Sequence, residues 1–160
     1  MPDPETYRFQ NDGGIPNSPL PLLLHRAALP ADAGAMERRF AANGWTGAWR
    51  NGIYPFHHFH SIAHEVLGIA RGSVRAALGG PGGAVLELRE GDVVVIPAGV
   101  GHRNLGDSGD LLVVGAYPGG AEWDLRRGDP AEHAEMVRNI AAVPLPAADP
   151  LTGCGGIWRE

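Results

Sequence analysis

The chain has 160 residues and a formal net charge of −5, and its 13 basic side chains are all arginine. This length suits one domain with a sizeable core, so we expect residues 1–160 to form a single domain. The acidic balance and the scattered arginines argue against a nucleic-acid partner and against an anionic membrane surface. The lack of lysine excludes Schiff-base chemistry and a phosphate-binding lysine.

The N-terminal segment and the single cysteine bear on location. MPDPETYRFQ is acidic and polar, whereas a secretory signal begins basic and continues apolar. The apolar stretch 19–24 is too short for a bilayer, which needs about 20 apolar residues. We therefore expect a cytoplasmic protein with no membrane partner. Cys154 has no second cysteine to pair with and no neighbouring histidine, so we interpret it as a bystander thiol.

The first predicted elements are a strand and a helix. The 24 glycines and 14 prolines punctuate apolar runs, which is typical of short strands joined by turns. Residues 20–29 form the first of these runs and predict a strand. Asp32 then favours the start of a short helix that ends at Asn43 and Gly44. The segment WTGAWRNG follows and leads into a histidine-rich stretch.

Six further strands are expected after the histidine-rich stretch. Each candidate is short, rich in β-branched residues and closed by glycine, proline or aspartate. Strands at this spacing indicate a sandwich or a barrel. The six candidates are residues 64–72, 73–80, 84–90, 92–99, 101–105 and 111–118.

A second helix and an ordered tail are expected at the C-terminal end. Asp129 and Pro130 form a favourable start for a helix over 131–143, whose apolar side chains recur on one side. The Pro/Gly-rich remainder, 144–160, can stay ordered only by lying on the domain. The apolar side chains expected on one helix side are Met136, Val137 and Ile140, and the expected anchors of the tail are Ile157 and Trp158.

The decapeptide FHHFHSIAHE contains four of the seven histidines and suggests a metal site. If 56–60 is a strand, His58 and His60 share one face, because side chains alternate along a strand. Two imidazoles at positions i and i+2 are near enough to bind one ion. After a turn, Glu65 returns on the neighbouring strand and can face the same interior.

The remaining histidines divide into one further candidate and several poorer ones. His102 is the later histidine on a predicted strand, and it can supply a fourth ligand. His25 lies in the first predicted strand and His133 on a polar helix face, so both are poorer candidates. His57 and His64 alternate away from the proposed metal face. We assign them to the surface, to the support of a ligand ring or to a subunit contact.

These residues carry a family resemblance. The stretch from Gly52 to Gly72 resembles the first motif of the cupin superfamily. Its spacing is Gly52, five residues, His58, one residue, His60, four residues, Glu65, six residues and Gly72, and every position agrees.

The stretch GDVVVIPAGVGH resembles the second cupin motif. Gly91, Pro97, Gly99 and His102 stand at the spacing of that motif. The family's asparagine four residues beyond the histidine is replaced by Gly106. This departure leaves the candidate ligands intact and puts any role of that asparagine in doubt.

The flanking segments resemble the YjlB-like group of bacterial cupins. The resemblance implies an all-β fold, namely an antiparallel jelly-roll β-barrel with a short N-terminal helix and a C-terminal helix. It places the metal-motif core at about 52–118 and the C-terminal helix and tail at 129–160. It also implies a homodimer and one divalent transition-metal ion per chain, which can be Fe, Mn, Ni, Cu or Zn. The implied ligands are His58, His60, Glu65 and His102.

The expected function follows from such an ion with open coordination positions. We expect a mononuclear metal-dependent enzyme of the dioxygenase type that acts on a small molecule. A metal-dependent isomerase and a non-enzymatic module that binds a small ligand or a metal are the alternatives. The isomerase is weakened because the obvious bases are already ligands. Four aromatic residues, Trp45, Trp49, Tyr54 and Phe56, either roof the pocket or fill the core.

Overall fold

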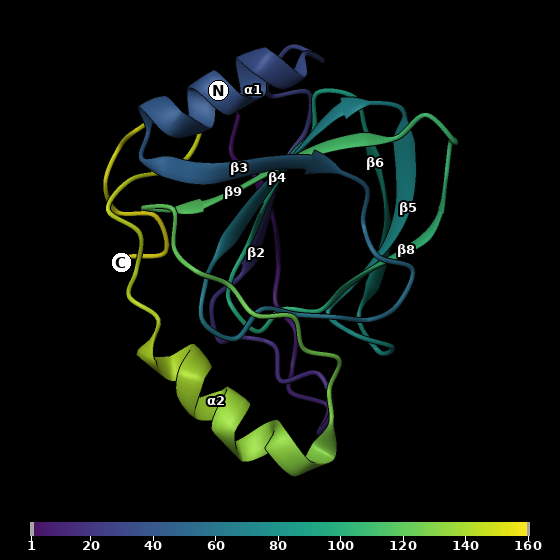
Figure 1. Ribbon diagram of the computed structural model, residues 1–160, viewed down its shortest axis with the longest axis vertical. Coiled ribbons are helices and arrows are strands. Elements are labelled where there is room, and N and C mark those ends of the chain that lie inside the picture. Colours follow the sequence, from purple (N-terminus) through teal and green to yellow (C-terminus); the bar gives the residue numbers. More distant parts are fainter. Residues whose placement is uncertain (1, 160) are drawn as a thin grey trace.

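The computed structural model describes residues 2–159 and is dominated by β-strands (Figure 1). The strands are β1 (Glu5–Tyr7), β2 (Leu22–His25), β3 (Trp45–Asn51), β4 (Glu65–Arg71), β5 (Ser73–Leu78), β6 (Ala84–Arg89), β7 (Val93–Ile96), β8 (His102–Asp107) and β9 (Leu112–Pro118). The helical segments are α1 (Ala33–Ala42), the 3-10 turn η1 (Pro130–Glu132) and α2 (His133–Ala142).

The strands form two antiparallel sheets that face each other. The larger sheet has the order β1-β2-β7-β4-β9-β3 and the smaller one the order β6-β5-β8. The predicted all-β antiparallel fold with two short helices is thereby confirmed. Within the described part of the chain, however, the hydrogen bonding does not close the two sheets into a continuous barrel.

Both faces of the larger sheet are buried, which explains its continuous apolar runs. Leu22 and Leu24 point into a cluster between the two sheets, whereas Leu23 points into a second cluster on the outer face. The same alternation places Val94 between the sheets and Val95 on the outer face. Simple polar and apolar alternation is therefore absent from these strands.

Helix α1 and the C-terminal tail cover the outer face of the larger sheet. Asp32 caps the helix as predicted, because its side chain accepts a hydrogen bond from the Ala35 amide at 2.8 Å. Met36 and Phe40 are fully buried on the sheet. Both belong to the outer-face cluster that also contains Ile157 of the tail.

The tail is anchored as the sequence predicts. Ile157 is buried, and the Trp158 indole donates a hydrogen bond to the Pro21 carbonyl at 2.8 Å. The Trp45 indole likewise donates to the Ala148 carbonyl at 2.8 Å. Trp45 is thus a core residue that holds the tail.

Helix α2 lies at the end of the molecule opposite α1 (Figure 1). Met136 is its buried side chain and packs with Ile15 and Phe59, whereas Val137 on the same helix is exposed. Neither this helix nor any other in residues 2–159 has the length and apolar character needed to cross a bilayer.

The structure differs from the sequence analysis in one predicted strand and in two strands that were not predicted. Residues 56–60 are not a strand, because only His58 and Phe59 make isolated bridges, one to β8 and one to Arg126. β3 was not predicted, since Thr46, Gly47 and Ala48 are exposed and leave no apolar period. The short strand β1 was also not predicted, and its residues are largely exposed.

Candidate metal centre

Backbone pairing brings the two predicted motifs together. The His58 amide donates to the His102 carbonyl at 3.2 Å, and the His102 amide donates to the His58 carbonyl at 2.9 Å. The two residues are therefore opposite each other, and their ring centroids lie 4.0 Å apart. Glu65 begins β4 and pairs with Ile96 of β7, at the same end of the sheets.

A glycine shapes the turn that presents His102. Gly99 has a φ of +94°, and a Cβ at this position would lie 2.4 Å from the Asn17 carbonyl oxygen. Only glycine tolerates both the left-handed backbone and this close approach. The turn is fixed further because the Gly99 amide donates to the His60 carbonyl at 2.7 Å. The second motif thus holds the first motif in place.

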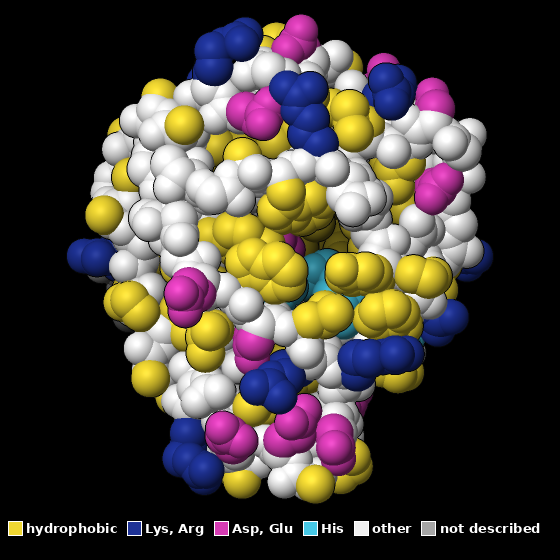
Figure 2. Space-filling view, viewed as in Figure 1, with side chains coloured by type: hydrophobic (Ala, Val, Ile, Leu, Met, Phe, Trp, Pro, Cys, Tyr) yellow, Lys and Arg dark blue, Asp and Glu magenta, His cyan; other side chains and the backbone are white. Residues whose placement is uncertain are grey.

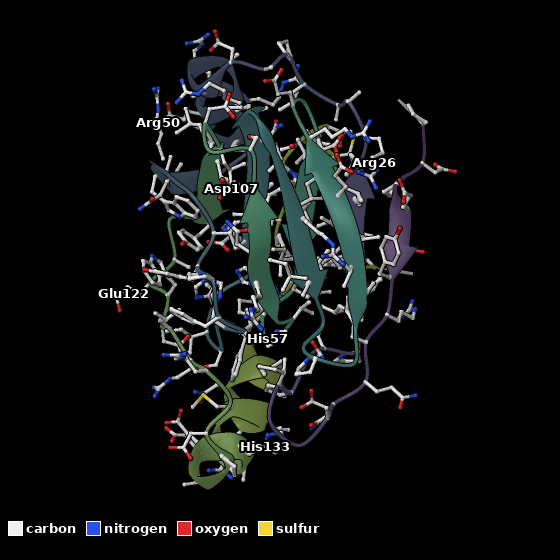
Figure 3. All side chains as sticks on the ribbon, turned by 90° about the vertical axis from the view of Figure 1, so that its right-hand side faces the viewer. Arg26, Arg50, His57, Asp107, Glu122 and His133 are labelled. Carbon is white, nitrogen blue, oxygen red and sulfur yellow. The ribbon has the colours of Figure 1, made fainter. Side chains whose placement is uncertain are left out.

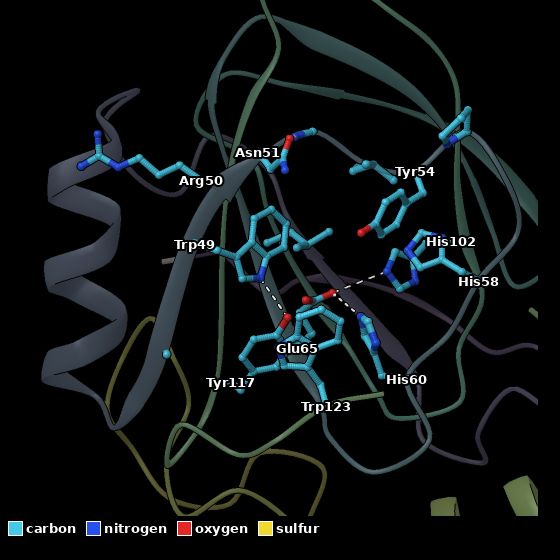
Figure 4. A pocket seen from close by; sticks show the side chains of 15 residues that line it. Trp49, Arg50, Asn51, Tyr54, His58, His60, Glu65, His102, Tyr117 and Trp123 are labelled. Carbon is cyan, nitrogen blue, oxygen red and sulfur yellow. Dashed lines mark hydrogen bonds and ion pairs between the residues drawn. The ribbon is translucent and has the colours of Figure 1, made fainter. Parts of the chain in front are cut away.

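Three of the predicted ligands cluster, and the fourth lies beside them. Ring nitrogens of His58, His60 and His102 lie within 4.8 Å of one another. Glu65 Oε1 lies 3.4 Å from His60 Nε2 and 3.5 Å from His102 Nε2 (Figure 4). Ligand atoms that surround one ion at about 2.0 to 2.2 Å are separated by distances of this order.

The tautomer of each ring is fixed by a backbone carbonyl. His60 Nδ1 lies 2.5 Å from the Asp124 carbonyl oxygen, His58 Nδ1 lies 2.9 Å from that of Phe56, and His102 Nδ1 lies 3.2 Å from that of Val100. A carbonyl only accepts hydrogen bonds, so each Nδ1 carries the proton. The Nε2 lone pairs are then available to a metal, as metal-binding histidines require.

Glu65 supplies the negative charge of the cluster. Its side chain is almost fully buried, and Oε2 has no hydrogen-bond partner within the described residues. A buried carboxylate oxygen without a partner costs several kcal/mol unless a cation compensates it. Three neutral imidazoles and one carboxylate therefore fit a single divalent ion.

Burial and mutual charge shift the pKa values of these side chains. Burial, together with the neighbouring His102 ring, lowers the pKa of His58 to about 3. Burial also acts to lower the pKa of His60, but the Glu65 carboxylate and the Asp124 carbonyl outweigh it and raise that pKa. Burial acts to raise the pKa of Glu65, and its histidine neighbours reverse the effect and lower it well below the usual range. At neutral pH His58 is therefore neutral and Glu65 is ionised.

Asp124 organises the surroundings of His60. Its carboxylate accepts hydrogen bonds from the Ser61 amide at 2.7 Å and from the Ser61 hydroxyl at 2.5 Å. Arg126 donates to the same carboxylate at 3.0 Å, and Asn139 of α2 donates to the Ser61 hydroxyl at 3.2 Å. One residue therefore supports the His60 ring through its carbonyl and the His60–Ser61 backbone through its side chain.

A cavity of about 410 Å³ opens above the cluster. Figure 2 shows hydrophobic side chains around a hollow with histidine inside it. The walls are largely aromatic, and Leu67 and Ile53 add apolar surface. This volume lies within the range of about 300 to 1,000 Å³ that is usual for small-molecule sites. The aromatic residues along the walls are Trp49, Tyr54, Tyr117 and Trp123.

The histidines judged poorer candidates lie away from the cluster. His25 is buried on β2, and neither ring nitrogen has a partner among the described residues. His133 begins α2, and its Nε2 lies 3.0 Å from the Asn11 side-chain nitrogen. His57 and His133 both lie toward the α2 end of the molecule (Figure 3). None of these three belongs to the metal-ligand cluster.

His64 points away from the cluster, as predicted, but it is not at the surface. Its Nδ1 accepts a hydrogen bond from the Ala98 amide at 2.9 Å, and its Nε2 lies 3.2 Å from the Pro144 carbonyl oxygen. The ring packs on Trp158 at a centroid distance of 4.8 Å. The C-terminal tail therefore covers His64, a long-range contact that the alternation of side chains does not reveal.

Three site residues were not predicted from the sequence. Tyr117 is a polar aromatic residue in an otherwise apolar strand. This contrast was the feature of the sequence that could have marked it as a site residue. Trp123 and Asp124 lie in a loop without periodicity, about 60 residues after His60, the proposed ligand that both contact. No local pattern links that loop to His60.

The two facing antiparallel sheets, with the histidine cluster at one end, define the cupin fold. No protein-family model matches the chain. The chain is 46% identical over 150 residues to the uncharacterized protein YjlB of Bacillus subtilis (strain 168), which covers 93% of this chain and 90% of YjlB. It belongs to the YjlB family of cupins.

Solved structures of other cupins are more distant. An acireductone dioxygenase from Bacillus anthracis, with cadmium in its active centre, aligns with a TM-score of 0.46 and 16% identity over 64% of this chain and 80% of that one. An oxalate decarboxylase from Bacillus subtilis aligns with a TM-score of 0.40 and 18% identity over 79% of this chain and 33% of that one.

Proposed function

We propose that the chain binds one divalent transition-metal ion through His58, His60, Glu65 and His102 and acts there on a small molecule as a dioxygenase-type oxidoreductase. The convergence of three carbonyl-oriented imidazoles on the buried Glu65, whose Oε2 has no hydrogen-bond partner among the described residues, carries the proposal. In this account the chain works as a cytoplasmic cupin.

The donor set limits the choice of metal. Three nitrogens and one oxygen, with no thiolate among them, suit iron, manganese, nickel, copper or zinc. Such an ion, when bound, supplies Lewis acidity, and iron adds redox chemistry. Cys154 is exposed in the tail and takes no part in the proposed site.

The residues of the pocket would hold the substrate and limit access of water. The aromatic walls present apolar surface to a bound molecule, and the four proposed ligands line the same pocket. The four ligand side chains are nearly completely buried, so they have little direct contact with bulk water. A molecule with two adjacent oxygen atoms could occupy the open side of the cluster.

The choice between dioxygenase and isomerase rests on the lack of a free base. Apart from the four proposed ligands, the described residues that line the pocket include no carboxylate and no imidazole. Tyr117 is a poor base, because burial raises the pKa of its hydroxyl far above the usual value. An isomerase must move a proton with such a group, so oxidation is favoured.

Oxygen uptake would test the enzymatic proposal. Iron-loaded protein is mixed with small molecules that carry adjacent oxygen donors, and oxygen is followed with an electrode. We expect substrate-dependent consumption that falls at least 100-fold in His102→Ala and is unchanged in His133→Ala. If the same molecules bind without turnover, the chain is a binding module and the enzymatic proposal fails.

A further inference from the structure

The walls of the pocket suggest which molecules it accepts. Building on the proposed function, we infer that the pocket selects a planar, conjugated molecule of the catechol type, with two adjacent oxygens toward the metal-ligand cluster and no charged group elsewhere. The inference rests on the aromatic walls and on the distribution of charge around them.

Aromatic rings flank the metal-ligand cluster on two sides (Figure 4). On one side Tyr117 and Trp123 stack at 5.9 Å, and Trp123 meets the His60 ring edge-on at 5.3 Å. On the other side the Tyr54 ring meets the His58 ring edge-on at 5.2 Å. A flat ring directed at the cluster would therefore meet aromatic faces or edges on both sides.

The Tyr117 side of the pocket is rigid. The Trp49 indole donates to the Tyr117 hydroxyl at 2.8 Å, so these two rings hold each other. Trp49 lies directly on β9, because a Cβ at Gly115 would come within 2.2 Å of its ring. This wall is preorganised, so a ligand that matches its flat surface binds without rearranging it.

In the described part of the chain, the pocket has no cationic side chain aimed at a ligand carboxylate or phosphate. Among the described residues that line it, Arg50 is the basic one outside the ligand set. Its guanidinium forms an ion pair with Glu37 and points toward α1, away from the histidines (Figure 4). Recognition of a ligand carboxylate usually requires an arginine or lysine aimed at it. The part of the ligand beyond its two oxygens is therefore uncharged.

Tyr54 supplies a polar group at the open side of the pocket. Figure 4 shows its hydroxyl directed toward the cavity, and the residue is 47% exposed. A hydroxyl both donates and accepts hydrogen bonds, so it suits a phenolic or carbonyl oxygen of the ligand. Tyr54 thus orients the ligand, and the aromatic walls select its shape.

The test compares two chelators that differ in shape and charge. The protein is loaded with one equivalent of iron(II) under nitrogen and titrated with 4-nitrocatechol, whose absorption reports chelation. The affinity for oxalate is then measured by its displacement of bound 4-nitrocatechol. We expect 4-nitrocatechol to bind at least tenfold more tightly than oxalate. Trp123→Ala should weaken 4-nitrocatechol at least tenfold and leave oxalate unchanged, whereas Trp123→Phe should retain most of the affinity.

Tyr54→Phe is an independent test. We expect it to lower the affinity for 4-nitrocatechol by about threefold to tenfold and to leave the affinity for oxalate unchanged. Tighter binding of oxalate, or equal weakening of both chelators in Trp123→Ala, would overturn this inference while the metal remains bound. Iron content measured on the same samples separates the two proposals. If wild-type protein takes up no metal, the proposed function fails together with the inference.

Discussion

At the scale of single residues, the site depends on groups that never face the pocket. Asp124 supports the position of His60 through two routes, its own carbonyl and the Ser61 backbone. Hydrogen-bond partners of metal-binding histidines typically contribute 10-fold to 100-fold to metal affinity or activity. The sequence marks the histidines clearly but contains no sign of this support, since it arises from a loop far along the chain.

Removing the Asp124 carboxylate should weaken metal binding without abolishing it. In Asp124→Ala the Ser61 amide and hydroxyl lose their acceptor, so the His60 ring is held less firmly. We expect a 10-fold to 100-fold loss in zinc affinity, measured by competition with a chromophoric chelator. Glu122→Ala is the matched control, because Glu122 lies in the same loop and projects outward (Figure 3). Equal affinities for the two variants would show that Asp124 has no such role.

At the scale of elements, the strands and helices were largely predictable, and the loops were not. Helix α1 could be predicted from Asp32 and from the Asn43-Gly44 end, and β4 to β9 from apolar runs between turn residues. The prediction of a strand over FHHFH was wrong, because His58 bridges to His102 and Phe59 bridges to Arg126, two distant segments. The ligands still converge, because the backbone pairing of His58 with His102 fixes their positions in place of the expected strand.

The packing of α1 on the larger sheet should contribute strongly to stability. Phe40 is fully buried in the outer-face cluster, so Phe40→Ala leaves a cavity as well as lost apolar contacts. We expect the free energy of unfolding to fall by about 3 to 5 kcal/mol, measured by urea titration. Arg38→Ala, on the same helix but outside the cluster, should change it by less than about 1 kcal/mol. A small effect at Phe40 would contradict the assigned core.

Docking of the tail should respond to acid through His64. Burial lowers the pKa of this ring in the folded chain to about 4, below the ordinary value of 6.5. The unfolded chain therefore binds the proton first, and stability that is present above pH 6.5 is lost as the pH falls toward 4. The full loss for this group is about 3 kcal/mol, from 1.36 kcal/mol per pKa unit.

The measurement is urea unfolding at several pH values between 7 and 4, with His64→Asn as the comparison. Asparagine can still accept a hydrogen bond from the Ala98 amide and does not titrate in this range. We expect wild type to lose more stability than the variant between pH 6.5 and 4. Parallel curves for the two proteins would rule out His64 as the source of the acid sensitivity.

At the scale of the whole molecule, the arrangement of layers determines which surface is free to contact a second copy of the chain. The outer face of the larger sheet is covered within the chain by α1 and the tail. Val85 and Leu105 of the smaller sheet stay partly exposed, so this sheet is the more suitable surface for a second copy. We expect the mass of a homodimer in light scattering after size-exclusion chromatography, and a monomer at all concentrations would contradict it.

Metal binding at the histidine cluster is the central property of the proposed site. Protein purified without an affinity tag or chelator is analysed by inductively coupled plasma mass spectrometry, beside His58→Ala, His102→Ala and the control His133→Ala. We predict about one equivalent of a transition metal per chain in the wild type and in the control, and a loss of it in both ligand variants. A wild type that contains no metal and takes none up on reconstitution, or ligand variants that retain it in full, would contradict the account.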